Sequence, residues 1–178
     1  KAKYYDLLVN GAFGTYRSLL EAITLDPAMG EWLSHSGNPK ADPAKGTSPD
    51  ENYAREVMQL FSIGLVQLQP DGTLLLDSTG QPIPTYDQAT VSETAKVLTG
   101  WAGLSLSENS TDLNQFANSF PGWVPVGFEG DDHPLLKPMR YFDAFHDKTA
   151  KRLVSLLQVP LAHATPTLVP AIKPGRRI

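Results

Sequence analysis

The segment SPDENYAREVMQLFSIG, residues 48–64, constrains the fold more than any other part of the chain. Ser48 and Glu51 have the spacing of a capping box, and Pro49 suits the first position of a helix. Apolar residues then recur at helical spacing and predict a stripe that faces the core. The segment therefore predicts an amphipathic helix that begins at Pro49, with a stripe made of Tyr53, Ala54, Val57, Met58, Leu60 and Phe61.

Other parts of the chain have the spacing and the caps of short helices. The predicted helices are residues 4–9, residues 15–25 capped by Thr15, a short helix begun by Asp26 and Pro27, residues 85–100 with a second capping box of Thr85 and Gln88, and a last helix over residues 139–157. Between them, the runs LVQLQ and TLLLD flank the turn signal Pro70-Asp71-Gly72 and predict a β-hairpin.

Proline and glycine interrupt these segments often, with 15 Pro and 14 Gly in 178 residues, so the connecting loops should be long. The longest loop, residues 102–138, contains the aromatic residues Phe116, Phe120, Trp123 and Phe128, for which packing into the core is favoured over a platform for sugar or peptide. The sequence predicts a mainly α fold: one irregular multi-helix domain over residues 1–160, with one small β-hairpin and long loops, followed by a Pro-rich tail at 161–178.

Charge and composition exclude several classes of partner and site. A net charge of −4 and a pI near 5.5 argue against a nucleic-acid-binding surface, which needs clustered Lys and Arg. No apolar run approaches the roughly 20 residues of a membrane span. Because the chain has no cysteine, it can have neither a disulfide framework nor a thiolate metal site. A protein or polymer partner remains possible on these grounds, and oligomeric state is left open.

Four short motifs, in this order and spacing, resemble a known bacterial family. They are DPAM, PDENYAREVMQLFSIG, KVLTGW and FHDKTAK, and together they resemble the family called domain of unknown function 1800. The resemblance covers about residues 4–154. It implies a secreted, mostly helical bacterial protein that acts in the periplasm or outside the cell, and it implies no particular activity. Members commonly continue beyond the segment matched by His146, Asp147 and Lys151, so the chain is expected to be a truncated member.

The polar side of the residue 48–64 helix is the first candidate site. Asn52, Arg55, Glu56 and Gln59 share one face and present a carboxylate, a guanidinium and two amides. Glu56 can serve as a general base while Arg55 holds an anionic group. Two other interpretations stay open: a solvated face with a weak pair between Glu51 and Arg55, and a polar network that joins this helix to its neighbour.

The second candidate site lies in the predicted last helix. There Asp143, His146 and Asp147 stand at positions i, i+3 and i+4, where a helix would bring their side chains to one side. Histidine with carboxylates at this spacing suits a divalent metal or an acid–base pair. No other cofactor is evident. Capping of a helix end is the alternative reading. His133, which follows two acidic residues, is a weaker metal candidate, and His35 and His163 carry no pattern.

No Gly-x-Ser-x-Gly elbow, phosphate-binding loop or His-Glu-x-x-His zinc motif is present. The leading hypothesis is a hydrolase of ester or related bonds that uses a His–carboxylate site, and the alternative is a non-catalytic cell-surface or extracellular interaction module. A fragment without activity of its own is a third possibility. The residues assigned are Glu56, His146 and Asp147 as catalytic groups, and Asn52, Arg55, Gln59 and Lys151 as substrate-binding groups.

Overall fold

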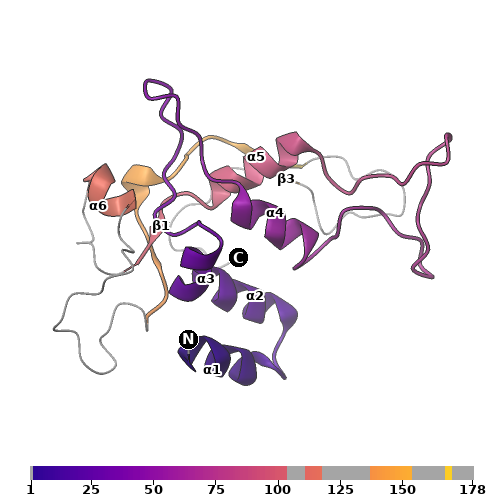
Figure 1. Ribbon diagram of the computed structural model, residues 1–178, viewed down its shortest axis with the longest axis horizontal. Helices are drawn as coiled ribbons and strands as arrows, with labels where there is room; N and C mark the ends of the chain where they lie inside the picture. Colours follow the sequence, from indigo (N-terminus) through magenta and orange to yellow (C-terminus); the bar gives the residue numbers. More distant parts are fainter. Residues whose placement is uncertain (1, 104–110, 118–136, 154–166, 170–178) are drawn as a thin grey trace.

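The computed structural model describes residues 2–103, 111–117, 137–153 and 167–169 (Figure 1). This part is mainly helical, which confirms the predicted fold class, and it also contains short antiparallel pairs. None of its helices has the length and apolar character needed to cross a membrane. The helices are α1 (Ala2–Gly11), α2 (Tyr16–Leu25), α3 (Pro27–Trp32), α4 (Asn52–Gln59), α5 (Gln88–Val97), α6 (Leu113–Ala117) and the short 3-10 helix η3 (Asp143–Phe145).

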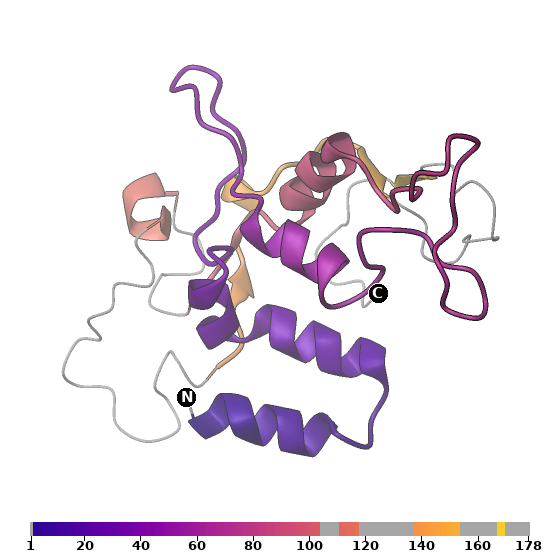
Figure 2. The same cartoon turned by 45° about the vertical axis from the view of Figure 1, so that its right-hand side comes forward.

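The first three helices form one end of the molecule. Helices α1 and α2 lie side by side at the base in Figure 2, and α3 follows α2 directly. Both predicted caps are confirmed. Thr15 Oγ1 accepts a hydrogen bond from the backbone N–H of Ser18, and the Asp26 carboxylate accepts one from Ala28 N–H with Pro27 in the first turn. These caps satisfy backbone donors that a helix start leaves unpaired.

The main core lies where α3, α4 and α5 meet. Helix α4 contributes most of the predicted stripe, but Leu60 is 66% exposed because α4 ends at Gln59, so that part of the prediction is wrong. The buried residues of this core are Met29, Tyr53, Ala54, Met58, Val91, Ala95 and Leu98.

The starts of α4 and α5 differ from the two predicted capping boxes. Helix α4 begins at Asn52, not Pro49, because the Asp50 carboxylate accepts the Asn52 N–H at 2.7 Å. Helix α5 is capped by Asp87, which accepts hydrogen bonds from both the N–H and the hydroxyl of Thr90 at 2.8 Å. In both cases an aspartate one or two residues before the helix takes the role assigned to a serine or threonine.

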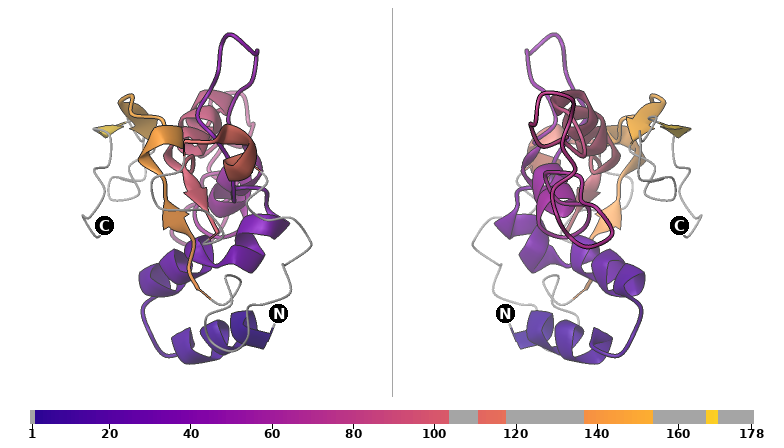
Figure 3. Two further views of the ribbon diagram at one scale, coloured as in Figure 1. Left: turned by 90° about the vertical axis from the view of Figure 1, so that its left-hand side faces the viewer. Right: turned by 90° about the vertical axis from the view of Figure 1, so that its right-hand side faces the viewer.

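The predicted last helix over residues 139–157 is wrong. The described part of this segment forms β2 (Arg140–Tyr141), then η3, then β3 (Lys151–Leu153), and it runs extended along the molecule (Figure 3). Strand β2 pairs antiparallel with β1 (Trp101–Ala102), and β3 pairs with β4 (Thr167–Val169). The apolar residues of the segment therefore pack by tertiary contact rather than along one helical face, which local propensity alone does not reveal.

A second core forms around α6 and the segment after β2. It consists of Ala102, Phe116, Phe142 and Phe145, and the rings of Phe116 and Phe145 stack with centroids 4.2 Å apart. Phe116 thus packs into the core as expected. Phe120, Trp123 and Phe128, together with His133 and His163, lie outside the described residues, as does the predicted tail except for residues 167–169.

Gly100 joins the two cores through a conformation that favours glycine. Its φ of +85° is left-handed, its N–H donates to Asn38 O at 2.9 Å, and its carbonyl accepts from Phe142 N–H at 2.7 Å. An added Cβ would lie 2.9 Å from His146 Cβ and 3.0 Å from Phe142 O. The chain therefore passes between two elements here with no room for a side chain.

Candidate functional site

The polar side of α4 meets α5, and the centre of this contact is Glu51. Its carboxylate accepts hydrogen bonds from Ser92 at 2.6 Å, from Gln88 Nε2 at 2.9 Å and from Arg55 at 2.7 Å. Arg55 also donates to Gln88 Oε1 at 2.7 Å. The hydroxyl of Ser92 and the amide of Gln88, followed by Arg55, lower the pKa of Glu51, so it stays ionised at neutral pH. Arg55 therefore belongs to a network that joins two helices.

The other polar residues predicted for this face of α4 do not join the network around Glu51. Asn52 and Gln59 are exposed, and Glu56 is half-buried. Within the described residues, the Glu56 carboxylate makes no hydrogen bond or ion pair. The substrate-binding role predicted for Asn52, Arg55 and Gln59, and the catalytic role predicted for Glu56, stay predictions.

His146 is buried against the end of α5. Its Nδ1 lies 2.7 Å from the carbonyl oxygen of Thr99, and because a carbonyl only accepts, Nδ1 carries the ring proton. Nε2 is then the acceptor nitrogen, and it has no hydrogen-bond partner among the described residues. Burial lowers the pKa of His146, and the nearby charge of Lys151 lowers it further, so the ring is neutral at neutral pH. Tyr141 packs edge-on to it.

Asp147 and Lys151 form a buried ion pair beside His146. Lys151 Nζ, only 3% exposed as a residue, donates to Asp147 Oδ1 at 3.1 Å, to Thr149 O at 2.8 Å and to the Asp147 carbonyl. The Asp147 carboxylate also accepts from Thr149 N–H and hydroxyl. Burial alone would raise the pKa of Asp147, but these hydrogen bonds outweigh it and lower the pKa. The backbone N–H of Asp147 donates to Thr99 Oγ1 at 2.9 Å.

Asp143 lies apart from this pair. It is exposed and forms an ion pair with Lys148, whose hydrogen bond lowers the pKa of Asp143. No group of three or more His, Asp and Glu side chains within the described ranges could hold a metal ion, and these ranges include Asp143, His146 and Asp147. The helical spacing on which their convergence depended is absent, since only residues 143–145 are helical.

His35 is a buried residue whose environment the sequence does not signal. Its ring stacks on Tyr53 with centroids 3.9 Å apart, and Nε2 donates to Thr24 O at 2.8 Å. Burial lowers the pKa of His35 to about 4, so the ring is neutral at neutral pH. Tyr53 in turn hydrogen-bonds the hydroxyl of Thr24 at 2.6 Å. His35 thus fixes the contact between α2 and α4.

Residues 65–85, called the arm below, project from the body on the side away from α6 (Figure 1). The predicted hairpin is present, since Leu68 and Leu74 face each other across the turn that contains Asp71. The chain then makes a second lobe, in which Leu76 faces Pro82, where the sequence predicted a loop. At the base, Val66 faces Pro84. The two lobes are visible side by side in Figure 2.

Three backbone hydrogen bonds close the centre of the arm into a ring. Gln67 N–H donates to Ile83 O at 2.8 Å, Ile83 N–H to Leu75 O at 3.0 Å, and Leu75 N–H to Gln67 O at 2.9 Å. Each of these residues therefore binds the other two, and the three limbs of the arm meet at one point. The arm holds its shape through its own backbone, although it extends away from the core.

The apolar face of the arm follows from this pairing. Side chains alternate along an extended chain, so the neighbours of Gln67, Leu75 and Ile83 point to the opposite side, and facing pairs point to the same side. Leu68, Leu74 and Leu76 are 49%, 50% and 49% exposed. The apolar face comprises Val66, Leu68, Leu74, Leu76, Pro82 and Pro84. The signal from which this face could have been found is three pairs of apolar residues two positions apart: Val66 and Leu68, Leu74 and Leu76, Pro82 and Pro84.

The family comparison agrees with the resemblance of the motifs. The family model described as "Protein of unknown function (DUF1800)" matches residues 1–158, and the chain belongs to this family. No curated protein and no solved structure matches the chain. Membership therefore names a family without an assigned activity, and the chemistry of the described residues has to carry any proposal about function.

Proposed function

We propose that this protein is a non-catalytic interaction module that binds a protein partner through the apolar face of the arm. The observation that carries the proposal is a projecting arm, closed by its own backbone hydrogen bonds, in which three leucines are half exposed. Alternation along its strands places six apolar side chains on one side. Contiguous apolar groups on a projecting surface mark interaction sites more often than single exposed residues do. The apolar face is also not needed to close the arm, because the ring of backbone hydrogen bonds already does so.

Polar groups in and beside the two candidate sites support the same conclusion. Glu51, Arg55, Asp147 and Lys151 satisfy one another or nearby backbone groups within the body. Such networks fix the relative positions of helices and strands. They hold the body that carries the arm, which is the role expected of them in an interaction module.

The proposal is tested with the triple variant Leu68→Ser, Leu74→Ser, Leu76→Ser. Proteins from the source organism that are retained by the wild-type chain are identified, purified and measured in binary binding. We expect the Kd of the true partner to rise at least about hundredfold in the variant, because three partly exposed leucines each contribute roughly 1 kcal/mol or more when buried.

Leu65→Ser is the matched control. Leu65 is 54% exposed and lies in the same arm, but alternation places it on the side opposite Val66. The Kd of the partner for the Leu65→Ser variant should remain within about threefold of the wild-type value, which is the change expected for a surface substitution. If a purified partner binds wild type and triple variant with equal Kd, or if no protein distinguishes the two, the interaction module is wrong.

A hydrolase remains a second candidate because of His146. Its Nδ1 proton is held by Thr99 O, which leaves Nε2 as a neutral acceptor in the tautomer that a general base requires. Nε2 of His146 is also not fully enclosed by the described residues. This arrangement supports proton transfer by His146, with Asp147 and Lys151 placing the segment that carries it.

The hydrolase candidate predicts activity that depends on His146. Ester, glycoside and phosphoester substrates are tested with wild type, His146→Gln and Glu56→Gln. Loss of a general base should lower kcat by about a hundredfold or more. Glu56→Gln shows whether Glu56 takes part. If no substrate is turned over, or if His146→Gln retains full activity, the hydrolase candidate is eliminated.

We also propose that the protein acts in the periplasm or outside the cell. Support comes from the family to which the chain belongs, because the resemblance of the motifs implies a secreted protein. A chain without cysteine is compatible with that environment, since its fold needs no disulfide. An interaction module at the cell surface would place the arm where it can meet another protein.

A further inference from the structure

We propose that the arm selects a cationic partner: a protein segment in which apolar residues that cover the apolar face are flanked by Lys or Arg. This inference rests on the interaction proposed above and deepens it by naming the chemistry of the partner. The features that carry it are the charge distribution of residues 56–95 and the way two carboxylates are fixed at the lobes of the arm.

The arm itself carries negative charge only. Between Arg55 and Lys96 the chain has no Lys, Arg or His. Five acidic residues stand in that interval, and two of them, Asp71 and Asp77, belong to the arm. Elsewhere Lys and Arg are interspersed with acidic residues. The lobes of the arm therefore present a field of one sign, which selects partners of the opposite sign and raises their association rate.

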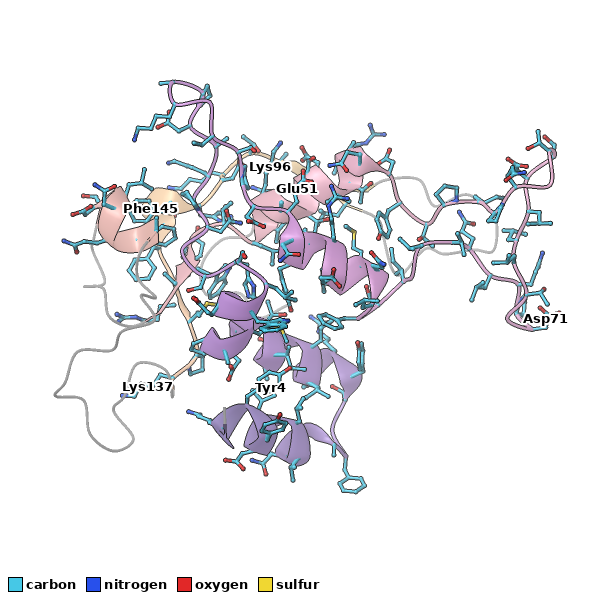
Figure 4. The ribbon with its side chains drawn as sticks, in the orientation of Figure 1. Tyr4, Glu51, Asp71, Lys96, Lys137 and Phe145 are labelled. Atoms are coloured by element: carbon cyan, nitrogen blue, oxygen red, sulfur yellow. The ribbon has the colours of Figure 1, made fainter. Side chains whose placement is uncertain are left out.

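Both carboxylates of the arm are held in fixed positions. Asp71, labelled near the end of the arm in Figure 4, accepts through Oδ1 from Thr73 N–H at 3.0 Å and from the Thr73 hydroxyl at 2.7 Å. Asp77 Oδ1 accepts from Thr79 N–H at 2.8 Å, from its hydroxyl, and from Gln81 N–H at 3.0 Å. In each residue only Oδ1 is used, so Oδ2 is left to accept from a cation.

Both groups are ionised at neutral pH. Hydrogen bonds from the N–H of Thr73 lower the pKa of Asp71, and those from Gln81 and Thr79 lower the pKa of Asp77. Apolar surface combined with charged groups is the usual composition of a protein interface, in which the apolar part supplies affinity and the charged part supplies selectivity.

The same charges disfavour two other occupants. A second copy that covered the apolar face would bring its own Asp71 and Asp77 toward these carboxylates, with no cation in either arm to pair with them. A lipid surface with anionic headgroups would be repelled for the same reason. A cationic protein segment is the occupant that satisfies both the apolar face and the two carboxylates of the arm.

The test uses three synthetic peptides of about nine residues in which leucine alternates with lysine, with serine or with glutamate. Binding is measured by fluorescence anisotropy on the full chain. We expect the lysine peptide to bind about tenfold more tightly than the serine peptide, and the glutamate peptide more weakly than either. The preference should shrink as salt is raised from about 0.02 M to about 0.5 M, because screening weakens exposed pairs.

Two variants separate this inference from the proposed function. Asp71→Asn with Asp77→Asn keeps the Oδ1 acceptor of each turn and removes both charges, so it should abolish the preference for the lysine peptide and leave serine-peptide binding unchanged. Asp42→Asn is the matched control, since Asp42 also accepts a backbone N–H two residues later but lies outside the arm. The leucine triple variant should lose binding of both peptides.

Each outcome has a separate meaning. Equal binding of lysine and serine peptides, both lost in the leucine variant, overturns the cationic partner and leaves the interaction module standing. Lysine-peptide binding that survives the leucine variant shows charge attraction alone and overturns both. Binding of no peptide also overturns both. Concentration-dependent dimers in sedimentation, lost in the leucine variant, would show a second copy as occupant and overturn the cationic partner.

Discussion

Replacing Gly100 by alanine should lower the free energy of unfolding by about 3 kcal/mol, a large effect for the addition of one methyl group. A side chain in the left-handed region costs about 1 kcal/mol. The added Cβ would also lie within 3.1 Å of His146 Cβ, His146 Cα and Phe142 O. Two of these three atoms belong to the backbone and cannot move aside without disturbing the contact between the two cores. Urea denaturation at neutral pH measures the change.

Gly46→Ala is the matched control for this prediction. Gly46 also has a left-handed φ, of +65°, but a Cβ there would meet nothing within 4 Å. We expect this variant to lose only about 1 kcal/mol, the cost of the backbone conformation. If the two variants lose the same amount, the close approach of His146 and Phe142 to Gly100 makes no contribution to stability.

Asp147→Ala should be about as damaging as Gly100→Ala, with a loss of about 3 kcal/mol in the free energy of unfolding. It leaves the ammonium of Lys151 buried without its counter-charge, and the side chain of Lys151 is only 4% exposed. The remaining acceptors are backbone carbonyls, which satisfy hydrogen bonds but do not neutralise the charge. Thermal and urea unfolding should both show the loss at neutral pH.

The double variant Asp147→Ala, Lys151→Met identifies the cause. If the penalty arises from an unpaired buried cation, replacing that cation with an apolar side chain of similar length should restore about 1 kcal/mol or more relative to Asp147→Ala alone. A double variant that is less stable than Asp147→Ala would show instead that Lys151 contributes through its hydrogen bonds to the backbone.

The sequence predicted best the parts of the fold that short-range chemistry controls. Thr15 and Asp26 cap their helices as expected, and Tyr53, Ala54 and Met58 are buried as their spacing indicated. The mainly α class and the first hairpin are confirmed for the same reason, because each depends on residues within one turn or one hairpin of each other.

The sequence failed where a distant element decided the outcome. The segment around His146 has helical spacing, yet β2 pairs with β1 and β3 lies against α5. Glu51 suits a capping box, yet its carboxylate turns to Ser92, 41 residues away. Neither contact leaves a local pattern, so no reading of periodicity could have found it.

The structure places some candidate residues in hydrogen-bond networks and leaves others exposed. Of the three open interpretations for the polar side of α4, the network between helices describes Arg55, and a solvated face describes Asn52 and Gln59. His146, Asp147 and Lys151 do lie together, but around Thr99, which no sequence motif marks as a partner. The apolar face of the arm is present in the sequence only as three pairs of apolar residues two positions apart, and the backbone pairing is needed to place all six on one side.

The ring of hydrogen bonds in the arm depends on the number of residues in each lobe. Gln67, Leu75 and Ile83 are separated by eight residues each, and the turns around Gly72 and Gly80 take no part in the ring. The ring therefore uses no hydrogen bond from a residue of either turn. A change in length does affect the arm: one residue added or removed within a lobe would send the following side chains to the other side, whereas two would restore them. Among relatives of this chain, the lobes should vary in length by even steps.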